Sequence, residues 1–219
     1  MDVGKIRRFS LKNVLPKIFS GEKDILSDVW NKEVAFDKGN AYLIEAVSGK
    51  GKSSLCSYIY GYREDYLGDI YWGMENIRSF DLKIWDAIRA KGLSLLFQEL
   101  NLFPELTALE NVLLKNNLTH YKSITQIDEM FSRLGIASRK HQKIEKMSWG
   151  QQQRVAIIRC LCQPFDFIIL DEPISHLDDD NAAIIASLVQ EEANRQQAGI
   201  VVTSIGKHLP LNYSKKILL

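Results

Sequence analysis

Cysteine is scarce in this chain, with only Cys56, Cys160 and Cys162 among its 219 residues. An odd count without metal-like spacing argues against a disulfide framework and is typical of a reduced, cytosolic protein. Cys160 and Cys162 fall in or beside a predicted helix, where residues two positions apart point to different sides and are poorly placed to share one zinc ion. We therefore expect the thiols to pack in the core.

Long apolar runs and an excess of charge are also missing. The most apolar segments, residues 165–170 and 182–189, are far shorter than the ~18 residues that a membrane-spanning helix needs. The formal net charge is only +1, whereas a general nucleic-acid binder normally carries a strong basic excess. We expect neither direct membrane insertion nor a nucleic-acid partner. If the protein works at a membrane, a partner must supply the spans.

The composition is that of a globular protein with a full core, at 46% hydrophobic and 25% charged residues. The length fits one domain spanning 1–219. No internal repeat, low-complexity stretch or coiled-coil heptad is visible.

Predicted strands and helices alternate along the chain, which indicates an α/β fold with a mainly parallel sheet. The expected strands are 6–19 (running into a loop), 28–36, 41–47, 69–72, 93–97, 167–170, 200–203 and 215–219. The expected helices are 52–60, 82–89, 107–139, 150–161 and 181–197.

Residues 46–53, AVSGKGKS, match a phosphate-binding loop between a predicted strand and a predicted helix. Gly49 and Gly51 allow backbone N–H groups to turn toward phosphate oxygens. Lys52 supplies a full positive charge, and the Ser53 hydroxyl can ligate Mg²⁺. The usual first glycine is replaced by Ala46. If that position needs a positive φ, alanine costs about 1 kcal/mol; otherwise it costs nothing.

Residues 167–172 form an apolar strand that ends in two adjacent carboxylates. Ligands of parallel α/β sheets collect at the carboxyl ends of the strands. Neighbouring residues on a strand point to opposite faces, so the two acids can have different roles. Asp171 would hold the Mg²⁺ shell, and Glu172 would orient and deprotonate the attacking water. Alone, such a pair is equally consistent with solvated acids at a strand end.

With these motifs in order, the chain resembles the ABC-type ATPases. Residues 148–154 resemble their signature motif, 167–173 their Walker B motif and 175–178 their D-loop. Residues 97–99 resemble the Q-loop, followed by 100–112, which is most similar to the nucleotide-binding subunits of the lipoprotein-release and macrolide-exporter type.

The resemblance implies a P-loop NTPase core, an N-terminal antiparallel β subdomain and a helical subdomain inserted at about 99–155. It also implies ATP and Mg²⁺ as ligands and a head-to-tail dimer, homomeric or heteromeric, in which Ser148 and Gly150 reach the partner's ATP. The residues it assigns to the nucleotide are Phe19, Ser48, Gly49, Lys50, Gly51, Lys52, Ser53, Ser54, Ser148, Gly150, Gln151 and Asp178. Ser53, Gln98 and Asp171 would hold the metal. Glu172, Gln98 and Ser204 would occupy the catalytic positions. Phe19 would stack on adenine, unless it is an ordinary core residue.

The chain departs from the family pattern in three places. Ala46 is the first, and the second is the signature segment, where Trp149 replaces the first glycine of the pair and Met147 replaces leucine. The third is Ser204, which stands where the family places a histidine that contacts the γ-phosphate. His208 follows four residues later, and His176 in the D-loop could partly substitute. We therefore expect ATP binding with slow hydrolysis.

The partner implied by the resemblance is a separate transmembrane permease. One of its cytoplasmic helices would dock beside residues 100–106, where Leu102, Phe103 and Pro104 either offer an apolar surface or pack internally. The protein would then be cytoplasmic, on the inner face of the membrane. The alternatives are a nucleotide-binding subunit with little or no hydrolysis, and a soluble non-transport ABC ATPase. The latter would need a long coiled coil or two such domains in one chain, and neither is visible.

Overall fold

The computed structural model describes residues 6–22, 25–175 and 177–219, and its β-strands form two sheets. The first is a parallel sheet of five strands in the order β6-β7-β8-β3-β9. Its strands are β3 (Ala41–Glu45), β6 (Leu93–Leu96), β7 (Phe167–Asp171), β8 (Gly199–Ser204) and β9 (Lys215–Leu218). The second is an antiparallel sheet in the order β2-β1-β4-β5. Its strands are β1 (Arg8–Pro16), β2 (Glu33–Asp37), β4 (Tyr66–Trp72) and β5 (Glu75–Asn76). The predicted α/β fold with a mainly parallel sheet and an N-terminal antiparallel sheet is confirmed.

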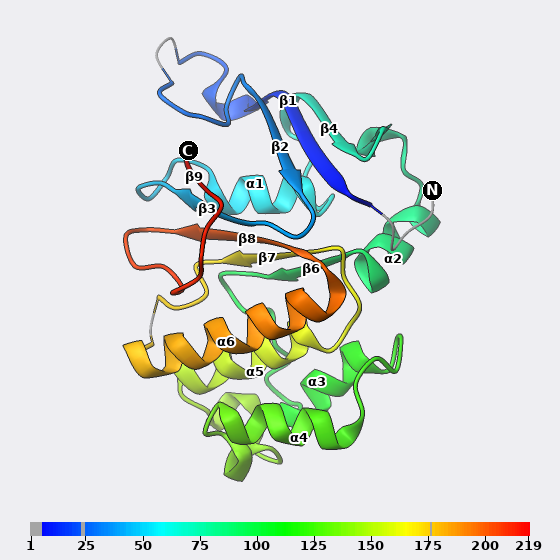
Figure 1. The fold of residues 1–219 in the computed structure, drawn as a ribbon, viewed down its shortest axis with the longest axis vertical. Helices are drawn as coiled ribbons and strands as arrows, with labels where there is room; N and C mark the ends of the chain where they lie inside the picture. The colour runs from blue at the N-terminus through cyan, green and yellow to red at the C-terminus, as the bar shows by residue number, and fades with distance from the viewer. Residues whose placement is uncertain (1–5, 23–24, 176) are drawn as a thin grey trace.

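The helices and the two sheets form successive layers (Figure 1). They are α1 (Lys52–Ile59), α2 (Leu82–Lys91), α3 (Ala108–Asn116), α4 (Ile124–Arg133), α5 (Trp149–Leu161) and α6 (Asp179–Gln196). Helix α1 lies between the antiparallel and the parallel sheet, whereas α5 and α6 cover the opposite face of the parallel sheet. Helices α3 and α4 lie beyond α5 and α6. Because both faces of the sheet are covered, the interior strand β7 is buried along its whole length.

Two apolar cores follow from this layering. One lies between the parallel sheet and helices α3 to α6, and the other lies between the two sheets around α1. Phe167 joins the second core, where its ring contacts Phe9 and Trp72 edge-on.

The three cysteines are free and buried, as expected. Burial raises the pKa of the Cys162 thiol to about 12, so this thiol stays protonated at neutral pH. No helix in the described part of the chain is long and apolar enough to cross a membrane.

Two expected elements differ from the structure. The strand predicted at 28–36 begins only at Glu33, because the Ser27 hydroxyl accepts the N–H groups of Val29 and Trp30 and closes a turn. The long helix predicted at 107–139 is two helices, α3 and α4. Asn117 ends the first, and Ser123 starts the second through a capping box with Gln126.

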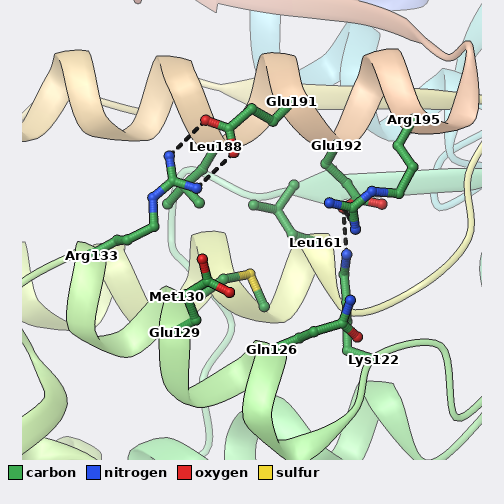
Figure 2. Close-up of a pocket in the computed structure, with 10 residues that line it drawn as sticks. All are labelled: Lys122, Gln126, Glu129, Met130, Arg133, Leu161, Leu188, Glu191, Glu192 and Arg195. Atoms are coloured by element: carbon green, nitrogen blue, oxygen red, sulfur yellow. Dashed lines mark hydrogen bonds and ion pairs between the residues drawn. The ribbon is translucent and has the colours of Figure 1, made fainter.

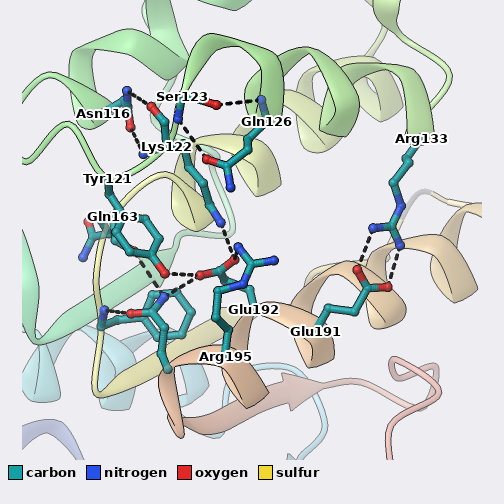
Figure 3. Close-up of polar contacts among 12 residues, drawn as sticks. Asn116, Tyr121, Lys122, Ser123, Gln126, Arg133, Gln163, Glu191, Glu192 and Arg195 are labelled. Carbon is teal, nitrogen blue, oxygen red and sulfur yellow. Dashed lines mark hydrogen bonds and ion pairs between the residues drawn. The ribbon is translucent and has the colours of Figure 1, made fainter.

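Helices α4 and α6 are joined by ion pairs across a small cavity of about 80 Å³ (Figure 2). Arg133 on α4 donates two hydrogen bonds to Glu191 on α6, at 2.6 and 2.7 Å. Lys122, just before α4, pairs with Glu192, and both side chains are almost fully buried. Glu192 also accepts the Tyr121 hydroxyl and lies 3.1 Å from Arg195 (Figure 3). Asn116 bonds the backbone of Lys122 and so fixes the lysine's position. The segment carrying α3 and α4 is therefore held to the core by charge as well as by apolar packing.

Candidate functional site

The loop between β3 and α1 has the backbone conformation that its glycines predict. Gly49 has φ 81° and Gly51 has φ 93°, in the left-handed region that favours glycine. Ala46 is not among the residues with positive φ, so alanine carries no conformational cost there. Its N–H donates to the carbonyl of Ser204 at the end of β8, at 3.2 Å. Of the two alternatives given for Ala46, the structure therefore supports the one in which alanine does not strain the backbone.

Lys52 extends its ammonium group into this loop. The side chain is 5% exposed, and Nζ donates to the carbonyl oxygens of Ala46 and Val47 at 3.1 and 3.2 Å. Nζ also lies 3.5 Å from Oε1 of Glu172. A phosphate oxygen is a stronger acceptor for an ammonium group than a neutral carbonyl is. The lysine can therefore exchange these carbonyls for a phosphate.

Asp171 ends β7 in a buried position. Only 3% of it is exposed, and its carboxylate accepts the hydroxyl of Thr203, the residue opposite it on β8. Burial raises the pKa of Asp171, while hydrogen bonds from the Thr203 and Ser53 hydroxyls oppose that rise. Such a carboxyl group gains from a nearby cation, because the cation favours its charged form.

Glu172 leaves the strand in the left-handed region, with φ 50°. Its N–H donates to the Thr203 carbonyl at 3.2 Å, and its own carbonyl accepts the Gln153 amide of α5 at 3.4 Å. These bonds turn the Glu172 side chain toward Gln98, whose Nε2 donates to it at 3.5 Å. Gln98 in turn accepts the Ser53 hydroxyl at 3.1 Å. One glutamine thus connects the first turn of α1 with the end of β7.

A cavity of about 260 Å³ lies at this junction. Its lining residues are Ser48, Gly49, Gly51, Lys52, Ser53, Ser54, Gln98, Glu172 and Ile205. The hydroxyl of Ser53, the amide oxygen of Gln98 and the carboxylate of Asp171 are hard oxygen ligands, the type that Mg²⁺ prefers. The donor set therefore fits a magnesium ion beside bound phosphates.

A second cavity of about 250 Å³ shares Ser48 and Gly49 with the first. Its walls include Phe19, which is partly exposed, together with Trp30 and the side chains of Ile25 and Leu26. The structure thus brings Phe19 next to the loop and leaves its ring accessible. Lys50 lines this second cavity and not the first.

The signature residues lie at the start of α5 and do not line either cavity. Ser148 is the N-cap: its hydroxyl accepts the Gln151 N–H, and Gln151 Oε1 accepts the Ser148 N–H. Trp149 is 43% exposed and Gly150 follows it in the first turn. Asp178 similarly caps α6, where the Asn181 N–H lowers the pKa of its carboxyl group. His176 lies outside the described residues.

Ser204 is also outside the cavities. It is 1% exposed, and its hydroxyl donates to the Lys207 carbonyl within its own loop. Ile205 lines the phosphate-side cavity in its place. His208 points Nδ1 toward the Gly206 carbonyl at 3.2 Å and does not line that cavity.

Two residues at the site were not expected from the sequence. Thr203 supports both acids, and Gln153 holds the carbonyl of Glu172. Thr203 directly follows the apolar run 200–202 on β8, which was a usable signal. Gln153 lies within the signature segment but on the buried side of the helix.

A third cavity, of about 320 Å³, has Phe97, the residue before Gln98, among its lining residues. We call it the aromatic groove. It is lined by Tyr60, Tyr62, Ser94, Leu95, Phe97, Asn101, Phe103, Leu114, Lys115, Arg159 and Cys160. Phe103 is 54% exposed there, whereas Leu102 packs against the core.

Comparison with known proteins decides the family. Residues 31–175 match the profile described as ABC transporter. The chain belongs to the ABC transporter family of ATP-binding cassettes. It is 30% identical over 212 residues to the lipoprotein-releasing system ATP-binding protein LolD of Francisella tularensis subsp. tularensis (strain FSC 198), covering 94% of this chain and 90% of LolD. It is likewise 30% identical to the phosphonates import ATP-binding protein PhnC 2 of Oceanobacillus iheyensis, covering 94% and 84%.

Among solved structures, the cassette resembles the ATP-binding cassette MJ0796 in a dimeric, post-hydrolysis state bound to ADP and Pi. The TM-score is 0.76 at 28% identity, covering 90% of this chain and 87% of MJ0796. The predicted membership of this family, and the likeness to the lipoprotein-release type, are confirmed.

Proposed function

We propose that this cassette binds and hydrolyses ATP as one subunit of a membrane transporter. One observation carries the proposal: a single cavity brings together Lys52, Gln98 and Glu172, with Asp171 behind them. These side chains come from three separate segments, and each has the chemistry that phosphoryl transfer to water requires. The domain would be one unit, with residues of about 99–155 forming its helical part.

Mg²⁺ would be held by Ser53, Gln98 and Asp171, and it would neutralise the charge that develops on the phosphate oxygens. Lys52 would release the loop carbonyls and bind the β- and γ-phosphates. The N–H groups of Gly49 and Gly51, and the N-terminus of α1, would surround the same oxygens. Ser48, Lys50 and Ser54 would contribute from the rest of the loop and the first turn of the helix. Phe19 would stack on the base, because its accessible ring borders the loop.

Glu172 would orient the attacking water and accept its proton. Its backbone is held by Thr203 and Gln153, so the carboxylate approaches from a fixed direction. Gln98 contacts both Ser53 and Glu172, and it would place the water between them.

A second ATP-binding subunit would complete each site. Ser148, Gly150 and Gln151 lie at the exposed N-terminus of α5, and Asp178 at that of α6. The positive end of a helix dipole favours an anion. These groups do not line their own subunit's phosphate cavity. We infer that they contact the nucleotide of the partner, in a dimer like that of MJ0796.

The aromatic groove would receive a short cytoplasmic helix of a separate permease. Its exposed residues Phe103, Tyr62 and Leu114 suit the apolar face of an amphipathic helix. This partner would hold the cassette at the inner face of the membrane. LolD and PhnC 2, by name, serve release and import systems, so the direction of transport is left open.

Slow hydrolysis remains our expectation, because Ser204 is bonded within its own loop and faces away from the cavity. A binding subunit with little turnover is the alternative that this observation favours.

ATP turnover by the isolated subunit, with and without the permease, tests these assignments. We expect low activity that Glu172→Gln abolishes and Ser204→His raises. A turnover that is unaffected by Ser204→His and survives Glu172→Gln would contradict the assignment. Binding of ATP without turnover, even with the permease present, would favour the binding-only subunit.

A further inference from the structure

Trp30 contacts the phosphate-binding loop but does not line the phosphate-side cavity; it lines the neighbouring cavity beside Phe19. The indole is 2% exposed, and its Nε1 donates to the carbonyl oxygen of Lys50 at 3.1 Å. The edge of the ring lies against Gly51, because a Cβ atom added to that glycine would be only 3.0 Å from Cζ2 of Trp30. One side chain therefore touches two successive residues of the loop.

The backbone of Trp30 is held by segments other than this loop. The Ser27 hydroxyl accepts the Trp30 N–H at 2.9 Å. On either side of Trp30, the Asp28 N–H donates to Leu218 at 2.7 Å and the Asn31 N–H donates to Val14 at 2.9 Å. The indole thus has a fixed position set by the two sheets.

The Trp30–Lys50 hydrogen bond also orients the neighbouring N–H group. In a planar trans peptide, the carbonyl of one residue and the N–H of the next point in opposite directions. No cis peptide bond occurs among the described residues. The Lys50 carbonyl faces Trp30, so the N–H of Gly51 points the other way. Gly51 and Lys52 both line the phosphate-side cavity, whereas Trp30 lines the cavity beside Phe19.

We propose that Trp30 is a positioning residue for phosphate binding: its indole N–H fixes the Lys50–Gly51 peptide so that the Gly51 N–H faces the phosphate before ATP arrives. Glycine residues make the loop flexible, and ordering a flexible loop weakens binding. A hydrogen bond to a rigid indole removes that ordering step. The inference rests on the proposed function, because it requires ATP to bind at this loop.

Trp72 provides a matched control. It belongs to the same apolar core as Trp30 and is fully buried. Its Nε1 is buried and has no hydrogen-bond partner among the described residues. Replacing either tryptophan by phenylalanine removes a similar volume from the same core. Only the change at Trp30 removes a hydrogen bond to the phosphate-binding loop.

The experiment measures the dissociation constant for Mg-ATP, kcat and KM, and the melting temperature without nucleotide, for wild type, Trp30→Phe and Trp72→Phe. Loss of one neutral hydrogen bond changes an equilibrium constant by a factor of about 5. We expect Trp30→Phe to raise the dissociation constant and KM about 5-fold, with kcat changed by less than about twofold. Trp72→Phe should leave the affinity for Mg-ATP close to that of wild type.

A second variant separates the hydrogen bond from ring size. Incorporation of 3-benzothienylalanine at position 30 keeps the shape of the indole and replaces its N–H by sulfur. It should weaken binding as Trp30→Phe does. Equal affinities for wild type and the benzothienyl variant would overturn the inference, as would equal losses in Trp30→Phe and Trp72→Phe. If either of these results is found but wild type binds Mg-ATP and Lys52→Ala abolishes that binding, the proposed function still stands. If wild type itself fails to bind Mg-ATP, both proposals fall.

Discussion

The ammonium of Lys52 lies 3.5 Å from the carboxylate of Glu172, so the residue proposed to bind phosphate directly faces the residue proposed to deprotonate water. Both side chains are almost fully buried. Under the proposed function, a phosphate in the loop would compete with Glu172 for Lys52. The carboxylate released in this way would then be available as a base.

Thr203 offers a test of how the two acids are held. Thr203→Val keeps the side-chain shape but removes the hydroxyl that donates to Asp171 and accepts the Glu172 N–H. A hydrogen bond to a charged group is worth about 1.5–3 kcal/mol, so we expect ATP turnover to fall by roughly 10-fold or more. Turnover assays across a Mg²⁺ titration check this. Thr203→Ser, which keeps the hydroxyl, should retain most of the activity, and equal losses in both variants would argue against the hydrogen bond as the cause.

Lys122 and Glu192 form the buried ion pair between α6 and the segment before α4. Lys122→Met leaves the Glu192 carboxylate buried without its main cation, which we expect to lower the free energy of unfolding by about 3–5 kcal/mol. Arg8→Met removes a pair on the surface, with side chains 58% and 40% exposed, and should lower the free energy of unfolding far less than Lys122→Met does, because solvent screens an exposed pair. Urea denaturation of both variants provides the comparison. Similar losses of unfolding free energy in the two variants would mean that burial does not increase the contribution of the Lys122–Glu192 pair to stability.

The lowered pKa of Glu191 predicts how the free energy of unfolding changes at acid pH. The hydrogen bonds from Arg133 lower its pKa to about 2, below that of an unfolded glutamate. Its contribution to stability is therefore complete above about pH 4.3 and is lost as the pH falls toward 2. Because the side chain is 49% exposed, we expect no more than about 1 kcal/mol. The difference in unfolding free energy between wild type and Glu191→Gln should shrink over this range. If this difference in unfolding free energy stayed constant down to pH 2, it would contradict the lowered pKa assigned to Glu191.

Phe103 tests the aromatic groove as a docking site. Phe103→Asp places a charge on an exposed apolar wall, and we expect co-purification with the permease and stimulation of turnover by it to be lost. A central aromatic contact is worth about 2 kcal/mol or more, or roughly 30-fold in affinity. Leu118→Asp alters another exposed apolar residue, outside the groove, and serves as the control. If both variants still respond fully to the permease, docking occurs elsewhere.

Much of the site could be predicted because short motifs place Lys52 after the loop that follows β3, and Asp171 and Glu172 at the end of β7. The carboxyl ends of parallel strands meet at one edge, so a correct order of strands and helices brought these residues together. Thr203 could not be assigned in the same way. Its role depends on β8 pairing with β7 so that it lies opposite Asp171, which is a matter of strand order and register.

Trp30 shows a second reason why part of the site could not be predicted from the sequence. Apolar alternation predicted a strand through 28–36, but the Ser27 hydroxyl closes a turn that periodicity does not detect. The hydrogen bond of Trp30 then crosses 20 positions to Lys50. Ser204 was singled out from the sequence as a departure from the family pattern. Its inward orientation, however, depends on a local bond to Lys207 that no spacing rule provides.

Helix α5 joins two distant regions of the molecule. Ser148 caps one end, and Arg159 and Cys160 line the aromatic groove at the other. Arg159 also binds the carbonyl of Asn101 at 2.6 Å, in the segment that follows Gln98. A helix of 13 residues is about 20 Å long and is stiff over that length. If α5 moves as a rigid body, a displacement of its groove end is also a displacement of its Ser148 end, without any change in the fold between them.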